Sequence, residues 1–391
     1  MKTMYKSILF VAIAGVMAVF NFSCKESDSG DPYISYVRVI NPESKDSLLV
    51  ASPLGQVIAI IGGNLQNTKE VWFNDQQAEV KPGYVTNSSI VVTVPNKAPT
   101  VVTNQIKLVS GNGNVLLYDF KVTISKPVLL NMDCEYLKPG GKAVINGGNF
   151  FLPMSVTFPG GVTVSGEGGN ITVNADDPNN PNTIATINIP ADATFAPGQI
   201  SVTTNFGTTK SGFWVQDNRN IFQSFDDAGW WAGKQITSPG PNDPPLINGP
   251  YYRITGVFGS WPWKEIFNWW QNHNIPDDAI LHPDKYNYKF EVNTIKPFNA
   301  NGIQVIVSDA TTNTNGGYFF WDGNTSAGID TKGEWHTMIF PLKDVLAARK
   351  SPLTVQSTYF FAFILHGSNT LDCDMCFDNF RIVPVTLPGS N

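Results

Sequence analysis

The stretch Ile145-Asn146-Gly147-Gly148-Asn149-Phe150 and its near copy Ile61-Gly62-Gly63-Asn64-Leu65 decide the fold of this 391-residue chain. In both copies an apolar run ends in Gly-Gly-Asn, residues that adopt positive φ angles and favour a sharp bend. A strand-like segment follows each bend, Val156-Thr157-Phe158 in one copy and Val71-Trp72-Phe73 in the other. This self-similarity predicts an internal repeat of two small β-sandwiches.

Prolines mark the limits of the two copies. Each begins near a proline, Pro32 or Pro127, and each later reaches a strand-like run that ends in Pro95 or Pro190. The repeated motifs resemble the immunoglobulin-like TIG domain, in which a G-x-N-F turn precedes a V-x-F strand; the first copy departs from it at Leu65. The resemblance implies tandem sandwiches that serve as spacers, and prolines at the junctions would stiffen them. We place these domains at residues 33–125 and 126–217.

The composition changes at about Asn218. Eight of the ten tryptophans lie beyond this residue. Strand-like runs open and close this part of the chain at 221–227 and 376–383. Further runs lie between them, at 286–292, 303–307, 335–340 and 359–365. The pattern predicts one jelly-roll β-sandwich over residues 218–391, with short helices only at 264–270 and 343–350. The predicted fold class is therefore all-β throughout.

The first residues have the pattern of a signal peptide. Lys2 and Lys6 precede an apolar run of 13 residues at 8–20, too short to span a bilayer. Asn21-Phe22-Ser23-Cys24 resembles, loosely, the cleavage box of bacterial lipoproteins, which implies that residues 1–24 are the signal and that Cys24 is acylated. The acidic tether at 25–32 resembles the export signal of surface lipoproteins of Bacteroidota. We therefore expect an outer-membrane, lipid-anchored, surface-exposed protein; an ordinary periplasm-facing tether is the alternative.

Charge and cysteine content exclude several classes of function. The net charge is −6, and no basic stripe is present to neutralise phosphates, which argues against nucleic acid as a partner. If Cys24 carries lipid, three cysteines remain, and these cannot all form disulfides. Cys373 and Cys376 have C-x-x-C spacing, but they lead into a strand and lack the second pair of ligands that zinc requires. We expect neither a disulfide framework nor redox chemistry.

Tryptophans in polar loops are the candidate ligand-binding residues. A flat indole covers the apolar C–H face of a pyranose at low entropic cost, and neighbouring polar groups then bind the hydroxyls. The leading candidates are Trp261 and Trp263, which flank Pro262, with Lys264 beside them. Further candidates are Trp230 and Trp231, of which an extended chain would expose only one, and Trp321 at the end of a strand.

The other tryptophans have structural interpretations. Trp269 and Trp270 follow Ile266 at helical spacing, which favours a short helix packed on the sheet. Trp335 begins a strand-like run and is expected in the core, as are Trp72 and Trp214 of the repeats.

No cofactor is predicted. Asp226, Asp227, Asp378 and Asn379 lie on the predicted terminal strands, where jelly-roll binding domains often hold a structural calcium ion. Nothing here has EF-hand spacing, so solvated acidic side chains are the favoured interpretation.

The chain is not predicted to be an enzyme. Carboxylates are plentiful in the last domain, but a glycosidase needs two of them placed across the scissile bond, and no hydrolase motif is present. The candidates are Glu265, Glu291, Asp309, Asp322 and Glu334.

Taken together, the order of segments resembles the surface glycan-binding proteins of polysaccharide-utilisation loci of Bacteroidota. The resemblance implies non-catalytic capture of a β-glucan, xyloglucan or a related polymer, and association with an outer-membrane glycan importer. An adhesin for host glycans or proteins is the first alternative, and a glycoside hydrolase or lyase the second.

Overall fold

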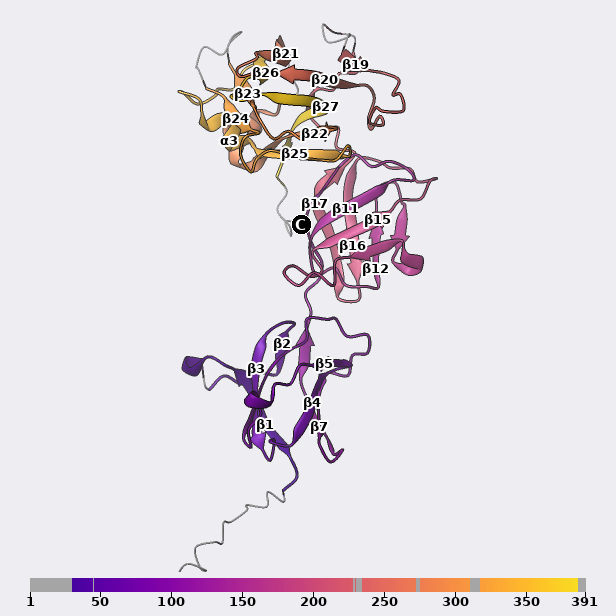
Figure 1. Ribbon diagram of the computed structural model, residues 1–391, viewed down its shortest axis with the longest axis vertical. Helices are drawn as coiled ribbons and strands as arrows, with labels where there is room; N and C mark the ends of the chain where they lie inside the picture. The colour runs from indigo at the N-terminus through magenta and orange to yellow at the C-terminus, as the bar shows by residue number, and fades with distance from the viewer. Residues whose placement is uncertain are drawn as a thin grey trace, which may run out of the picture. The chain divides into compact units, whose positions relative to one another are not determined.

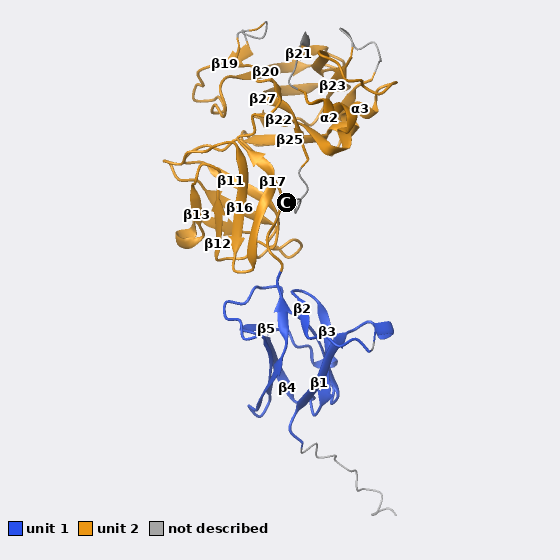
Figure 2. Cartoon of the chain, turned by 180° about the vertical axis from the view of Figure 1, so that it is seen from behind, with its two compact units in different colours: residues 1–124 blue, residues 125–391 orange. Residues whose placement is uncertain are grey.

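The computed structural model describes residues 30–44, 46–227, 229, 234–271, 275–309 and 317–385 (Figure 1). The chain divides into two compact units, residues 1–124 and 125–391 (Figure 2). Nearly all of their regular structure is β-strand, as predicted. Among the residues described, no helix is long and apolar enough to cross a membrane.

The first unit is one sandwich of two antiparallel sheets. One sheet has the order β1 (Tyr33–Val39), β3 (Val57–Gly63), β6 (Ser89–Thr93), and the other the order β5 (Gln76–Ala78), β4 (Thr68–Phe73), β7 (Gln105–Ser110), β8 (Val115–Asp119). A short parallel pair, β2 (Ala51–Pro53) and β9 (Lys121–Thr123), lies beside them. Alternate residues such as Ile58, Ile60, Val71 and Phe73 fill the space between the two sheets.

The second sandwich repeats this topology. Its first sheet has the order β10 (Val128–Met132), β11 (Lys142–Gly148), β15 (Ile184–Asn188), β14 (Ile171–Val173). Its second sheet has the order β13 (Thr163–Ser165), β12 (Met154–Thr157), β16 (Gly198–Thr204), β17 (Gly207–Val215). Strands β10, β11 and β15 correspond to β1, β3 and β6, so the internal repeat read from the sequence is present in the fold.

The Gly-Gly-Asn bends differ from the prediction in one respect. The asparagines, Asn64 and Asn149, have the positive φ, at 57° in both copies. The glycines serve close approach instead: a Cβ atom at Gly62 would collide with the carbonyl oxygen of Tyr33, and one at Gly147 with that of Val128. The motif therefore specifies tight pairing of neighbouring strands, β1 with β3 and β10 with β11, followed by the turn.

The C-terminal sandwich consists of two larger sheets. The first has the order β19 (Gln235–Ile236), β20 (Tyr251–Phe258), β27 (Leu371–Pro384), β22 (Tyr286–Thr294), β25 (Trp335–Pro341), with β18 (Ile221–Gln223) also paired to β27. The second has the order β21 (Lys264–Gln271), β26 (Tyr359–Leu365), β23 (Gly302–Ser308), β24 (Phe319–Asp322). An aromatic core lies between them, in which Phe290, Phe363, Phe377 and Phe380 contact one another.

Two expectations about secondary structure in this domain need comment. The helix predicted at 264–270 is wrong, because these residues form β21 and pair with β26 along its whole length. The spacing of the apolar residues in this segment is compatible with a strand as well as with a helix. Pairing with β26 is what makes it a strand. The predicted helix near 343–350 is confirmed as α3 (Leu342–Ala347), and a second short helix, α2 (Asp277–Leu281), was not foreseen.

Trp72 and Trp214 are not core residues, contrary to expectation. Both lie half-buried on outer strand faces, where a cation covers each ring: Lys107 Nζ is 4.4 Å from the centroid of Trp72, and the guanidinium of Arg219 is 3.9 Å from that of Trp214. Strand alternation turns their neighbours Phe73 and Val215 inward instead. Trp335, in contrast, is 6% exposed and packs against Tyr251, so its predicted burial is confirmed.

The thiols of the C-x-x-C pair point to opposite faces of β27. Cys373 lies in the sandwich core, whereas Cys376 lies on the other face with Tyr251 and Trp335. Three positions apart on a strand, the two side chains cannot meet. Burial raises the pKa of Cys373 to about 12 and raises that of Cys376 further. Reactive thiolates are therefore not available at either position.

A buried cluster of charges joins the second sandwich to the C-terminal one. Glu135, which follows β10, places Oε1 2.5 Å from Lys289 Nζ and Oε2 2.7 Å from Arg381 Nη2. Arg381 also binds Glu291, with Nη1 2.7 Å from Oε2. Glu135, Glu291 and Arg381 are fully buried, and Lys289 is 4% exposed. We call these four residues the joint cluster.

Hydrogen bonds donated by backbone N–H groups also join the two sandwiches. Thr337 N donates to the Asp133 carbonyl at 2.7 Å, and Glu135 N donates to Thr337 Oγ1 at 2.8 Å. Because Lys289, Glu291 and Arg381 lie on β22 and β27, the second sandwich covers that face of the first C-terminal sheet. In Figures 1 and 2, β25 lies toward the second sandwich and β21 away from it. The surfaces around β20 and β21 are therefore open to a ligand.

The buried carboxyl of Asp378 is expected to make the stability of this region depend on pH. Its carboxylate is fully buried, and Oδ2 has no hydrogen-bond partner among the described residues. Burial, and secondarily the charge of Glu291, raises the pKa of Asp378 well above its ordinary value. A carboxyl whose pKa is higher folded than unfolded stabilises the fold at acidic pH, and this contribution is lost as the pH rises toward the folded pKa.

We expect Asp378→Asn to reduce this loss. The amide keeps an oxygen for Asn379 N, which lies 2.8 Å from Asp378 Oδ1, but cannot ionise. Between pH 5 and pH 8, the urea midpoint of unfolding should fall less for the variant than for the natural protein. Equal falls in the two proteins would contradict a titrating Asp378.

Candidate functional site

Two exposed tryptophans dominate the loop between β20 and β21. The side chains of Trp261 and Trp263 are 57% and 53% exposed, values that exceed those of Trp72, Trp214, Trp321 and Trp335. Both have a left-handed backbone, with φ of 57° at Trp261 and 40° at Trp263. This conformation costs a bulky residue about 1–2 kcal/mol and tends to persist at functional sites. The loop is thus held in a strained form that displays two indoles to water.

Neighbouring loops hold this strained conformation in place. Trp261 N donates to the carbonyl of Gly367 at 2.6 Å, directly after β26. The fully buried Asn301 donates from Nδ2 to the carbonyls of Gly259, at 3.1 Å, and Asn369, at 2.8 Å. A side chain at Gly367 would collide with the backbone at Gly302, so only glycine permits this approach. Three loops are thereby tied together beneath the tryptophans.

His366 separates the two indoles. Its ring lies edge-on to both, with centroid distances of 5.3 Å to Trp261 and 5.0 Å to Trp263. The imidazole is half-buried, and its backbone N donates to the Gly302 carbonyl at 2.9 Å. Contacts of this edge-to-face kind favour a defined ring orientation. We call Trp261, Trp263 and His366 the aromatic triplet.

Polar groups border the aromatic triplet. Trp263 Nε1 donates to Glu265 Oε1 at 3.1 Å, and Asn268 Nδ2 donates to the same oxygen at 2.7 Å. Lys264 is exposed, and its Nζ lies 5.8 Å from the ring centroid of Phe258. The indole faces thus lie next to a carboxylate, an amide and an ammonium group, all of which can bind hydroxyls.

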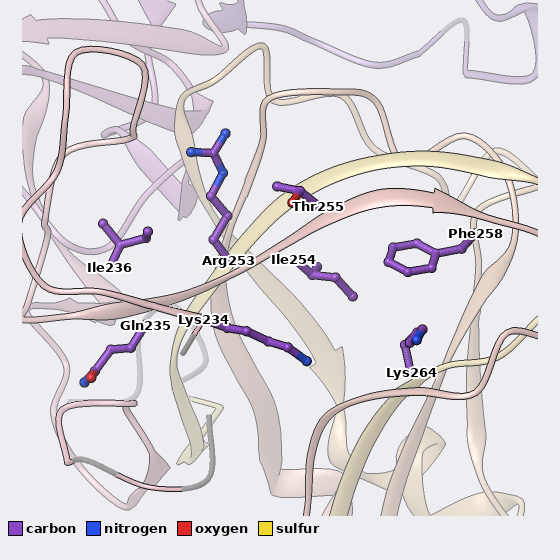
Figure 3. A pocket seen from close by; sticks show the side chains of 8 residues that line it. All are labelled: Lys234, Gln235, Ile236, Arg253, Ile254, Thr255, Phe258 and Lys264. Atoms are coloured by element: carbon purple, nitrogen blue, oxygen red, sulfur yellow. The ribbon is translucent and has the colours of Figure 1, made fainter. Parts of the chain in front are cut away.

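A pocket of about 600 Å³ lies beside the aromatic triplet (Figure 3). Both ends of the tryptophan loop border it, through Phe258 on one side and Lys264 on the other. The remaining lining comes from the middle of β20, from β19 and from the residue that precedes β19. The lining residues are Lys234, Gln235, Ile236, Arg253, Ile254, Thr255, Phe258 and Lys264.

The structure corrects the assignment of Trp321. This side chain is only 2% exposed and lies between Phe290, Phe298 and Phe340 in the sandwich core. Its Nε1 donates to the Ala327 carbonyl at 2.7 Å, so the polar turn after β24 satisfies the buried indole rather than displaying it. Trp321 therefore cannot stack on a ligand.

Three other predicted positions lie outside the described residues: Trp230, Trp231 and the lipidation residue Cys24. Trp269 and Trp270 lie in β21 and pair through their backbones with Phe361 and Phe360 of β26.

The four residues considered as calcium ligands differ in their burial. Asp378 and Asn379 are fully buried, whereas Asp226 and Asp227 are exposed after β18. Within the described part of the chain, no group of three or more His, Cys, Asp or Glu side chains is placed to hold a metal ion.

His366, Asn301 and Thr255 are site residues that the sequence did not reveal. His366 lies a hundred residues beyond the tryptophans that it contacts, and its neighbours give no motif. Asn301 is one of many asparagines in the chain, and only its burial distinguishes it. Lys234 is different, because it follows the candidate tryptophans Trp230 and Trp231 closely in the sequence.

Comparison with known proteins agrees with this geometry. Residues 215–384 match the family model described as the surface glycan-binding protein B xyloglucan-binding domain. Surface glycan-binding protein B of Prevotella bryantii superposes with a TM-score of 0.63 at 23% identity, over 91% of this chain and 99% of that one. A protein B from a complex xyloglucan utilisation locus of Bacteroides uniformis gives a TM-score of 0.50 at 17% identity, over 91% and 100%.

A relative in Bacteroides ovatus, named an IPT/TIG domain-containing protein, is 22% identical across 98% of this chain and the whole of its own. The solved structures establish a shared fold, and the family model identifies the C-terminal sandwich. The predicted resemblance to surface glycan-binding proteins of Bacteroidota is thereby confirmed, by the family match over residues 215–384 and by a fold shared over 91% of the chain.

Proposed function

We propose that this protein binds a polysaccharide without cleaving it, and that the polysaccharide is a β-glucan such as xyloglucan. The observation that carries the proposal is the pair of exposed indoles, Trp261 and Trp263, held in a strained loop by hydrogen bonds and by His366. Exposing two large aromatic side chains side by side has no use in folding, and it favours a binding surface.

The energetics of stacking suit a polymer ligand. Complete burial of a large apolar side chain is worth roughly 1.5–3 kcal/mol, and a sugar covers only part of each indole. Two or three such contacts with hydrogen bonds reach about −8 kcal/mol, a micromolar Kd. Two exposed indoles on one loop fit an extended β-linked chain, which presents successive sugar faces along one direction.

The comparisons support the class of ligand. The family model that covers residues 215–384 is named for xyloglucan binding, and one structural relative comes from a xyloglucan utilisation locus. The shared fold spans 91% of this chain, so the resemblance includes the spacer domains as well as the binding domain.

Three of the carboxylates considered as catalytic candidates are already engaged in other interactions, which supports a non-catalytic role. Glu265 already accepts hydrogen bonds from Trp263 and Asn268, and Glu291 is fully buried in the joint cluster. Asp309 forms an ion pair with Arg349 at 3.1 Å. A glycosidase instead needs two carboxyl groups that face each other across a glycosidic bond.

Affinity electrophoresis tests the proposal directly. We expect gels that contain xyloglucan or barley β-glucan to retard the protein, and gels that contain host mucin to leave its migration unchanged. Retardation by mucin alone would favour an adhesin. Release of reducing ends during a long incubation with xyloglucan would show an enzyme and contradict the proposal.

His366 is expected to act through the tryptophans. Each of its two edge contacts is worth about 0.5–1.5 kcal/mol, so His366→Ala should weaken glycan binding about tenfold in calorimetry. His366→Phe keeps an aromatic edge between the indoles and should restore most of the affinity. If alanine and phenylalanine weaken binding equally, the positioning role is excluded.

We further propose that acylation at Cys24 anchors the protein to the outer membrane, exposed at the cell surface, where an outer-membrane glycan importer is its partner. The signal-like segment and the acidic residues after Cys24 support this location. Two or more acyl chains are needed for stable anchoring. Metabolic labelling with a palmitate analogue should mark the natural protein and leave Cys24→Ala unmarked, and protease treatment of whole cells should remove the natural protein.

A further inference from the structure

The pocket between β19, β20 and β21 has a chemistry of its own, distinct from that of the exposed tryptophans. Ile254 and Phe258 give it an apolar wall, and Lys234 and Lys264 bring ammonium groups to it. In Figure 3 the Lys234 side chain extends toward the space near Ile254 and Phe258, whereas the Arg253 side chain points away from it. An apolar wall with hydrogen-bond donors at its margin suits a pyranose, which has apolar faces and polar edges.

Aromatic rings lie beneath both ammonium groups. Lys234 Nζ is 5.5 Å from the ring centroid of Tyr252, and Lys264 Nζ is 5.8 Å from that of Phe258. Cations at such distances are attracted to the ring faces. The lysines are thus directed to the two sides of the pocket, where they can donate to hydroxyls of one bound sugar.

Arg253 is not available to a ligand in the same way. Its Nε and Nη2 each lie 2.8 Å from an oxygen of Asp374, and Nη1 also binds Asp243. Bidentate binding of a ligand carboxylate is the recognition for which arginine is best suited. Because these two aspartates already occupy the guanidinium, the pocket is better matched to a neutral sugar than to an acidic one.

The position of the pocket indicates which part of a glycan would enter it. Phe258 and Lys264 are the residues that bracket the tryptophan loop, so the pocket and the aromatic triplet share a border. A main chain lying flat across Trp261 and Trp263 continues along the open surface. Only a group that projects from the main chain can enter a concavity at its side.

We propose that this pocket is a separate subsite for a neutral sugar branch of the glycan. The inference rests on the proposed function, because it requires the main chain to lie on Trp261 and Trp263. Its volume of about 600 Å³ is within the range of small-ligand pockets and has room for a branch sugar. The pocket makes the protein selective for branched β-glucans over unbranched ones with the same main chain.

Calorimetry with two matched ligands tests the subsite. The branched ligand is a xyloglucan oligosaccharide with four main-chain glucoses, and the unbranched ligand is cellotetraose. The natural protein is expected to bind the branched ligand at least tenfold more tightly. Lys234→Gln removes one ammonium group, and Lys234→Trp fills the pocket from the position whose side chain extends into it. Both variants should lower the affinity for the branched ligand toward that for cellotetraose, and leave cellotetraose binding unchanged.

Val257→Trp is the matched control for Lys234→Trp, since it also adds an indole to an exposed position, but one that is 71% exposed on β20 and does not line the pocket. It should retain the preference for the branched ligand. Equal affinities of the natural protein for the two ligands, or equal losses for both in Lys234→Trp, would overturn the subsite while the proposed function stands. Failure of the natural protein to bind either ligand would instead overturn the proposed function, and the subsite with it.

A charged branch is the competing possibility, and salt distinguishes it. Raising sodium chloride from 0.1 to 0.5 M should change the affinity for the neutral branched ligand less than twofold. Tighter binding of a xylan oligosaccharide that carries a glucuronic acid branch, lost at high salt, would mark the pocket as an anion site and overturn the proposal.

Discussion

Replacing both Trp261 and Trp263 with alanine is expected to abolish retention of the protein in xyloglucan gels. Each indole provides a large part of the stacking surface, so each single substitution should cost about 1–2 kcal/mol, or roughly 5- to 30-fold in Kd. The double variant loses the whole platform and falls below detection in calorimetry. Since both side chains are more than half exposed, the variants should fold normally.

Tyr84→Ala is the control for the double tryptophan variant, because it also removes an exposed aromatic side chain. Tyr84 lies in the first sandwich and is 56% exposed, nearly the same as Trp261, so the substitution removes an equally accessible aromatic ring from a different surface. It should leave retention unchanged. Retention of the double tryptophan variant at the natural level would show that the glycan binds elsewhere.

Arg381→Ala is expected to have the largest effect on stability. The substitution leaves Glu135 and Glu291 buried with much of their charge uncompensated, and breaking a buried ion pair in this way costs about 3–5 kcal/mol. For a unit of this size we expect a loss of roughly 10 °C in the melting temperature. Because the cluster joins two sandwiches, their unfolding should also separate into two transitions in calorimetry.

An exposed ion pair provides the comparison. Lys296 lies 2.7 Å from Asp372, but their side chains are 48% and 60% exposed, so water and salt screen the pair. Lys296→Ala should therefore change stability by at most about 1 kcal/mol. A melting temperature for Arg381→Ala within two degrees of that of Lys296→Ala would show that the joint cluster does not stabilise the fold.

The sequence predicted what local patterns determine. Alternation and turn residues predicted strands in all three sandwiches, although β21 was predicted as a helix, and the repeated Gly-Gly-Asn motif predicted the duplicated topology. Trp261 and Trp263 were also correctly predicted to be exposed. Their neighbours include proline and glycine, which are typical of loops and rare in a packed core. These features depend on residues close together in the chain.

What the sequence could not reveal depends on distant contacts. Trp321 appeared exposed because a polar turn follows it, but that turn supplies the carbonyl of Ala327 to a buried indole. The joint cluster combines Glu135 with Arg381, 246 residues apart, and no local signal marks either residue as buried. His366 likewise meets the tryptophans only because β26 pairs with β21.

The left-handed backbone of the tryptophan loop also gives a way to read related sequences. Glycine and asparagine adopt a positive φ with little strain, so either would relieve the backbone at position 261 if the ring served no purpose. Drift in lineages that no longer use the loop should therefore lead to these small residues. An aromatic residue kept at this position marks the homologues that still use the surface, and sequence surveys can sort them on that basis.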